Sequence, residues 1–129
     1  MLTFIVDPDP DCRDMLAVSL SRHGHHVMTF ETFDDACRVV EQGTAADLAV
    51  VEVRVPGRLT LEDFAMRLRH TNSSATVVIY STEERCRREL VALGADGFVL
   101  RPEDVWPTLA ALIKLRGHRN GTMPIPVMQ

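Results

Sequence analysis

Residues 2–10 read LTFIVDPDP, and the rest of the chain repeats the pattern that this stretch begins. Its first five residues are apolar or β-prone without the alternation of a half-exposed strand, which is typical of a strand buried on both faces of a parallel sheet. In the acidic turn that follows, Asp9 can cap a helix and Pro10 suits the first helical position. The stretch predicts a buried strand that leads directly into a helix.

The alternation of strand and helix recurs four more times. Further strands are expected at residues 27–30, 48–51, 76–80 and 97–100. Further helices are expected from residue 32 to about 43, from residue 60, from about 83 to 93, and up to about 115. Five such units with right-handed crossovers predict an α/β fold, namely a doubly wound five-stranded parallel sheet of order 2-1-3-4-5 with five helices, as in flavodoxin. Other open parallel sheets remain possible on periodicity alone.

Length and composition fit one domain. The chain has 129 residues, of which 46% are hydrophobic, and this is enough for a core without disulfides or metal. We expect the domain to cover residues 1–116. Residues 117–129 contain two Gly and two Pro without a helical period, so a flexible tail is expected there.

Charge and cysteine content exclude several classes of function. The net charge of -4 provides no broad positive field for nucleic acid or anionic lipid, and no helix-turn-helix segment follows Leu115. No apolar run approaches membrane-spanning length, and the N-terminus lacks the basic region of a signal peptide. The three cysteines form no C-x-x-C pair, which favours a reducing compartment. We expect a cytoplasmic protein that binds neither nucleic acid nor membrane.

Four polar residues stand where predicted strands end. Asp7, Glu52, Ser81 and Arg101 each close one of these strands. In doubly wound sheets the ligand site lies beyond the carboxyl ends of the strands, where the strand order reverses. These four side chains are therefore expected to share one pocket.

Three segments of the chain carry a recognisable pattern, namely IVDPDPD at residues 5–11, DLAVVEVRVPG at 47–57 and GADGFVLRP at 94–102. Together they resemble the response regulator receiver domain, the CheY-like phosphoacceptor module of bacterial two-component systems, and the resemblance extends from residue 2 to about 115. It implies an acidic pair after the first strand that holds Mg²⁺ and an Asp after the third strand that accepts a phosphoryl group. It also implies a Thr or Ser after the fourth strand and a Lys before a Pro after the fifth.

The sequence departs from that pattern at three places, so its phosphorylation site is degenerate. Pro8 has no side-chain oxygen where the second acid is expected, and Asp9 lies one residue further on. Glu52 replaces the acceptor Asp, and its extra methylene displaces the carboxylate on the order of 1.5 Å, an error that can cost about a hundredfold in rate. Arg101 replaces the Lys. We expect phosphotransfer to be lost and Mg²⁺ binding to be lost or weak, with no catalytic residue and no cofactor.

Arginine can compensate for a missing cation. Asp7 and Glu52 supply two negative charges, and Arg54 and Arg101 can supply two positive ones, so we predict a pocket that is neutral without a metal. The alternative is that Arg54 points to solvent and only Arg101 pairs with Glu52.

The resemblance also implies roles for Ser81 and Phe98. They stand where receivers carry the hydroxyl and the aromatic side chain that move on phosphorylation. A capping Ser and a core Phe are the alternative.

A partner surface is predicted on the last third of the chain. The resemblance implies that the fourth helix, fifth strand and fifth helix form a face for dimerisation or partner docking. The last helix is also more apolar than one buried stripe requires, which favours a homodimer or partner interface. Solvated helix charge is the alternative for the arginines. The candidate interface residues are Arg85, Arg87, Arg88, Trp106, Leu109 and Leu112.

Three histidines form the remaining cluster. His23, His25 and His26 fall in the turn after the first helix, and no carboxylate or Cys completes a metal-ligand set there. A solvated turn is therefore preferred to a metal site.

The expected function is that of a stand-alone receiver-like protein in phosphorelay signalling. We expect it to be no enzyme, not to be phosphorylated, and to act by binding a histidine kinase or a downstream effector. The alternatives are a working receiver phosphorylated by a histidine kinase and a flavodoxin-type small-molecule binder. The acidic loop Asp7–Asp9 argues against the last, because it offers no Gly, Ser or Thr for a phosphate.

Overall fold

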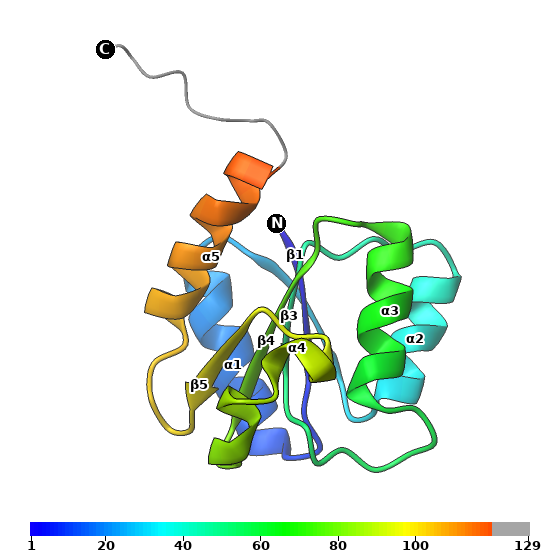
Figure 1. Ribbon diagram of the computed structural model, residues 1–129, viewed down its shortest axis with the longest axis horizontal. Coiled ribbons are helices and arrows are strands. Elements are labelled where there is room, and N and C mark those ends of the chain that lie inside the picture. The colour runs from blue at the N-terminus through cyan, green and yellow to red at the C-terminus, as the bar shows by residue number, and fades with distance from the viewer. Residues whose placement is uncertain (120–129) are drawn as a thin grey trace.

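A computed structural model describes residues 1–119, with side chains through Leu115 (Figure 1). Its centre is one sheet of five parallel strands in the order β2-β1-β3-β4-β5. This order confirms the predicted fold class. The strands are β1 (Leu2–Val6), β2 (His26–Phe30), β3 (Leu48–Val51), β4 (Thr76–Ser81) and β5 (Gly97–Leu100).

Helices cover both faces of the sheet. Figure 1 shows α1 and α5 on one side and α2 and α3 on the other. The helical segments are α1 (Pro10–Arg22), α2 (Phe33–Glu41), α3 (Leu61–Thr71), a 3₁₀ turn η1 (Glu84–Arg87), α4 (Leu90–Leu93) and α5 (Trp106–Arg119). Within this range no helix is long and apolar enough to cross a membrane.

The sheet separates two apolar layers, because successive side chains of a strand point to opposite faces. Phe4 packs with Phe33 and Phe64 beneath α2 and α3. Its neighbour Ile5 packs with Leu20 and Leu109 beneath α1 and α5. All six side chains are almost fully buried, and burying such a side chain contributes about 1.5–3 kcal/mol.

Side-chain caps explain where three helices begin. The Asp9 carboxylate accepts a hydrogen bond from the backbone of Asp11 before α1, and the Thr32 hydroxyl accepts one from Asp35 in α2. At α3, Thr60 and Asp63 form a reciprocal capping box. Such caps contribute about 1 kcal/mol each.

The prediction of one continuous fourth helix from about 83 to 93 is wrong. The structure has the η1 turn and then the four-residue α4, and neither has a side-chain cap. Charged residues dominate the first half, and of η1 only Cys86 is buried. One inward side chain provides no apolar stripe to hold a longer helix on the sheet.

The last helix is longer than predicted. It continues past residue 115 to Arg119, three residues into the segment 117–129 assigned to a tail. Residues 120–129 lie outside the described part of the chain, so the prediction of a flexible tail is untested for them.

Candidate functional site

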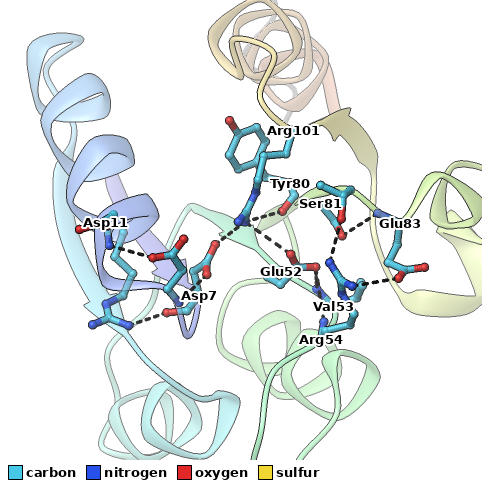
Figure 2. Close-up of polar contacts among 12 residues, drawn as sticks. Asp7, Asp11, Glu52, Val53, Arg54, Tyr80, Ser81, Glu83 and Arg101 are labelled. Carbon is cyan, nitrogen blue, oxygen red and sulfur yellow. Dashed lines mark hydrogen bonds and ion pairs between the residues drawn. The ribbon is translucent and has the colours of Figure 1, made fainter.

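The four strand-closing residues meet at one edge of the sheet (Figure 2). Glu52 continues the strand pairing, since its backbone N–H donates to Val6 O at 2.9 Å. The N–H of Arg101 likewise donates to Ser81 O at 3.0 Å. The ladder between strands thus brings together residues that are far apart in sequence, as the sequence pattern predicted.

Arg101 lies at the centre of the pocket. Its Nη2 is 2.5 Å from Asp7 Oδ2 and 3.5 Å from Glu52 Oε2. The same nitrogen donates to Tyr80 O at 3.2 Å, and the guanidinium lies over the Tyr80 ring at 5.0 Å. One arginine therefore contacts both pocket carboxylates and is held from a third side by β4.

The charges of this buried cluster, by which we mean Asp7, Glu52 and Arg101, are shielded from water. The Asp7 and Glu52 side chains are 3% and 6% exposed, and that of Arg101 is 21% exposed. Burial alone lowers the pKa of Arg101, but the neighbouring Asp7 carboxylate, with a smaller effect of Glu52, raises it above its ordinary value. The positive charge of the pocket is therefore permanent.

The other carboxylate oxygens are bound by backbone groups. Asp7 Oδ1 accepts the N–H of Asp9 at 2.8 Å. Glu52 Oε1 accepts the N–H of Val53 at 2.7 Å and, at 3.4 Å, that of Arg54. Each carboxylate is thus held on one side by its own loop and on the other by Arg101.

Arg54 does not join the buried cluster, so the predicted balance of two carboxylates by two arginines is wrong. Its Nη2 donates to Thr82 Oγ1 at 2.8 Å, and its Nη1 lies 3.3 Å from Glu83 Oε1. The side chain is 58% exposed. Figure 2 shows it reaching toward Glu83, because the loop after β3 turns it to the rim.

The donor set at the first loop does not fit a magnesium ion. Pro8 supplies no side-chain oxygen, and the Asp9 carboxylate is turned to the α1 cap. The Asp7 carboxylate already contacts a fixed positive charge, which a divalent cation would have to displace. Within residues 1–115, whose side chains the structure describes, no three His, Cys, Asp or Glu side chains are grouped so as to hold a metal.

Ser81 and Phe98 have the geometry of a capping serine and a core phenylalanine, which was the alternative to a switch role. The fully buried Ser81 hydroxyl accepts the N–H of Glu83 at 3.1 Å and so closes the turn after β4. Phe98 is 8% exposed and packs in the same apolar layer as Phe33 and Phe64. The guanidinium of Arg87 lies over its ring at 4.9 Å.

Sequence reasoning missed Cys12 and Tyr80. Burial, followed by a hydrogen bond to Asp7 and the charge of that carboxylate, raises the pKa of the Cys12 thiol to about 12. Tyr80 supplies the carbonyl and ring that hold Arg101. A signal was available for both: Cys12 precedes the buried Leu16 by one helical turn, and Tyr80 ends an apolar run directly before Ser81.

The three histidines have different environments, so a uniformly solvated turn is wrong. His25 is buried, and its Nδ1 lies 2.8 Å from Thr3 Oγ1. Burial lowers its pKa. The His23 ring stacks on Trp106 with centroids 3.9 Å apart, while His26 is exposed.

The candidate interface residues divide into exposed charges and packed apolar groups. Arg85 pairs with Glu83 and Glu89, Arg87 pairs with Glu84, and Arg88 is exposed. In α5, Leu109 is fully buried, and Trp106 and Leu112 are partly buried against the same core. Much of the apolar surface of α5 is therefore used to pack on the sheet.

A groove remains between η1, α4, β5 and α5. Arg87, Leu90, Phe98, Ala111 and Leu112 are among the residues that line it. It combines an apolar floor with one basic and one acidic group, since Asp96 also lines it.

Comparisons with known proteins agree on one family. The model of the response regulator receiver domain matches residues 3–113. No curated protein matches the chain in sequence.

Solved structures show the same fold at low sequence identity. NtrX from Brucella abortus has a TM-score of 0.81 at 20% identity, over 94% of this chain and 29% of that one. The chain therefore spans less than a third of NtrX. TrrA from Thermotoga maritima, solved with Mg²⁺ and BeF, has a TM-score of 0.72 at 24% identity, over 88% and 97%. CheY4 of Vibrio cholerae has a TM-score of 0.74 at 22% identity, over 86% and 97%.

Proposed function

Because the chain belongs to the response regulator receiver domain family, we propose that it is a signalling module that takes no phosphoryl group and acts by binding another protein. The observation that carries this proposal is the position of Arg101. Its guanidinium lies between Asp7 and Glu52 and contacts both carboxylates.

Phosphoryl transfer depends on positioning and on positive charge that meets the transferred group. In this pocket the positive charge is already engaged by Asp7 at 2.5 Å. The Glu52 carboxylate is held by Val53 N–H on one oxygen and faces Arg101 with the other. An attack by Glu52 would have to break these contacts, and the loop provides no metal site to replace them. These contacts support a pocket that does not take part in phosphoryl transfer.

The groove between η1, α4, β5 and α5 is the surface that we assign to the partner, a histidine kinase or a downstream effector protein. Ala111 is exposed in this groove, so Ala111→Glu is expected to weaken partner binding. Met66→Glu is a matched control, because Met66 is 67% exposed in α3 and does not line the groove.

A working receiver is the second candidate, and one observation favours it. Glu52 Oε2 is 3.5 Å from Arg101, which is a loose contact that leaves this oxygen weakly held. TrrA, which has the same fold, was solved with Mg²⁺ and BeF. Nothing in the pocket favours a flavodoxin-type ligand.

A phosphoryl-mimic titration separates the two candidates. Beryllofluoride with Mg²⁺ is added to the protein and to a variant in which Pro8→Asp, Glu52→Asp and Arg101→Lys are combined, and backbone amide NMR spectra are recorded. We expect shifts around the pocket in the combined variant and none in the natural chain.

Acetyl phosphate with intact-mass measurement is the complementary test. The natural chain is expected to keep its mass. A gain of one phosphoryl group that disappears in Glu52→Gln would refute the proposal and establish the second candidate.

A further inference from the structure

The outward face of α1 carries an ordered stripe of side chains. Its members recur at i, i+3, i+4, i+7 and i+11, so they share one side of the helix. That side is opposite Cys12, Leu16 and Leu20, which bury against the sheet. The stripe, which we call the α1 stripe, consists of Asp11, Asp14, Met15, Val18 and Arg22.

The centre of the α1 stripe is apolar and its ends are charged. Met15 and Val18 are 51% and 52% exposed, and they are two of the few large apolar side chains left open to solvent in the described part of the chain. Acids stand at the N-terminal end and Arg22 at the C-terminal end. Among residues 1–115, no side chain pairs with the Asp14 carboxylate, the Asp11 carboxylate or the Arg22 guanidinium.

These charges differ from three exposed arginines of the molecule that have carboxylate partners. Arg38 pairs with Asp35, Arg67 with Glu41 and Arg87 with Glu84, each within 3.1 Å. On α1, acid and base stand too far apart along the helix to meet within one molecule. A second molecule can supply the partners that the first one lacks.

The stripe is complementary to itself. If two α1 helices lie antiparallel with the midpoint between Leu16 and Ala17 on the two-fold axis, Met15 of one copy faces Val18 of the other. In the same register Asp11 faces Arg22, and Asp14 faces the Ser19 hydroxyl. A two-fold interface repeats every contact twice, and antiparallel helix dipoles add to the attraction.

The surface beside the α1 stripe contains two hollows. Met15 and Ser19 line both hollows, one that runs toward Arg22 and His23 and one bounded by Pro102, Glu103 and Asp104. Two further acids thus border one hollow, and Asp14, Arg22 and an imidazole border the other.

We propose that a second copy of this chain docks on the α1 stripe and forms an isologous dimer. This places self-association on α1 and not on the face of the fourth helix, fifth strand and fifth helix, where the apolar residues are largely packed. The proposal goes beyond the proposed function and does not depend on the state of the pocket. A single helix face predicts a weak, concentration-dependent dimer.

The polarity of α1 has a competing explanation, because acids at the N-terminus and a base at the C-terminus also stabilise an isolated helix through its dipole. Sedimentation equilibrium of the full chain over a wide concentration range distinguishes the two. We expect the natural chain to dimerise reversibly. Asp11→Arg and Arg22→Glu, each alone, face like charges twice and are expected to weaken the dimer by about tenfold.

Charge-swap recovery is the decisive measurement. A mixture of the Asp11→Arg and Arg22→Glu chains is expected to form a heterodimer, because one stripe is basic at both ends and the other is acidic. The chain with both substitutions is expected to dimerise again, although the helix dipole then opposes the new charges. If these charges only stabilised the helix, mixing the two single variants would not restore dimerisation. The double variant would then have the lowest dimer affinity of all the chains.

Apolar variants and a folding control complete the test. Val18→Glu is expected to weaken the dimer by about a hundredfold, while Met66→Glu, an exposed apolar-to-acid change on α3, leaves it unchanged. Circular dichroism checks that each variant is folded. A natural chain that stays monomeric at every concentration overturns the proposal, as does a dimer that Ala111→Glu abolishes and Val18→Glu does not.

Discussion

Two groups of charged side chains lie at the same end of the sheet and differ in their access to water. The buried cluster of Asp7, Glu52 and Arg101 has side chains 3%, 6% and 21% exposed. A second group, which we call the rim cluster, surrounds the turn after β4, and its side chains are 29% to 58% exposed. It consists of Arg54, Glu83, Arg85 and Glu89.

The difference in exposure decides how much each charged residue contributes to the stability of the fold. In the buried cluster the two carboxylates have lost nearly all contact with water and depend on Arg101, so the loss of this partner leaves uncompensated buried charge. In the rim cluster water replaces a lost partner at little cost. Arg54 and Arg101 look equivalent in the sequence, but Arg101 lies in the pocket and Arg54 lies on the exposed rim.

Removing Arg101 should have the largest effect on this contrast. Arg101→Met keeps most of the side-chain volume but leaves Asp7 buried without its partner, so we expect the free energy of unfolding to fall by about 3 kcal/mol. Urea denaturation at neutral pH measures this. Arg54→Met, with the same change in chemistry, is the control.

A double substitution tests whether the loss comes from an unpaired charge. Asp7→Asn together with Arg101→Met should be more stable than the sum of the two single losses predicts. Strict additivity would mean that the two side chains are not coupled, and the contrast between the clusters would then have a different cause.

The burial of the pocket should also make the Cys12 thiol slow to react with thiol reagents. With its pKa raised to about 12 from 9.0, roughly a thousandth of the thiol is ionised at pH 9, against about half for an unperturbed thiol. Thiol-reactive reagents should therefore leave Cys12 unmodified at pH 9 in the folded protein and label it after unfolding.

Asp7→Asn sharpens that measurement, since the Asp7 carboxylate contributes to the raised pKa of Cys12 after burial itself. Labelling of Cys12, followed by peptide mass spectrometry, should become faster in this variant. Cys37, far from the pocket, is the internal reference. Rapid labelling of Cys12 in the natural folded chain would contradict the buried geometry.

Removing Arg54 should have the smallest effect. Arg54→Ala loses an exposed ion pair with Glu83 and a hydrogen bond to Thr82, and we expect a loss of about 0–1 kcal/mol that shrinks further in high salt. A loss as large as that of Arg101→Met would show that the rim cluster is as important to the fold as the buried one.

The sequence predicted the strands and the pocket well, for a physical reason. Buried parallel strands have nearly continuous apolar runs, so β1, β3 and β5 fall at the predicted residues. Polar residues that close such strands must meet at one edge, which is why the sequence alone predicts that Asp7, Glu52, Ser81 and Arg101 share a pocket.

Other features could not be predicted because they depend on side-chain direction. The turn of the loop after β3 sends Arg54 to the rim, and no periodicity encodes that turn. The break between η1 and α4 results from the absence of an apolar stripe, although the residues there are good helix formers. The burial of His25 depends on Thr3, a residue 22 positions away across the sheet.

The contact between α1 and α5 has an optical consequence. Trp106 is the only tryptophan of the chain, and its indole stacks on His23 at the end of α1 with His25 against its edge. Its fluorescence therefore reports whether α5 is seated on α1, not whether the pocket is filled. Trp106 is thus an intrinsic fluorescent probe of the C-terminal end of α1, and it needs no added label.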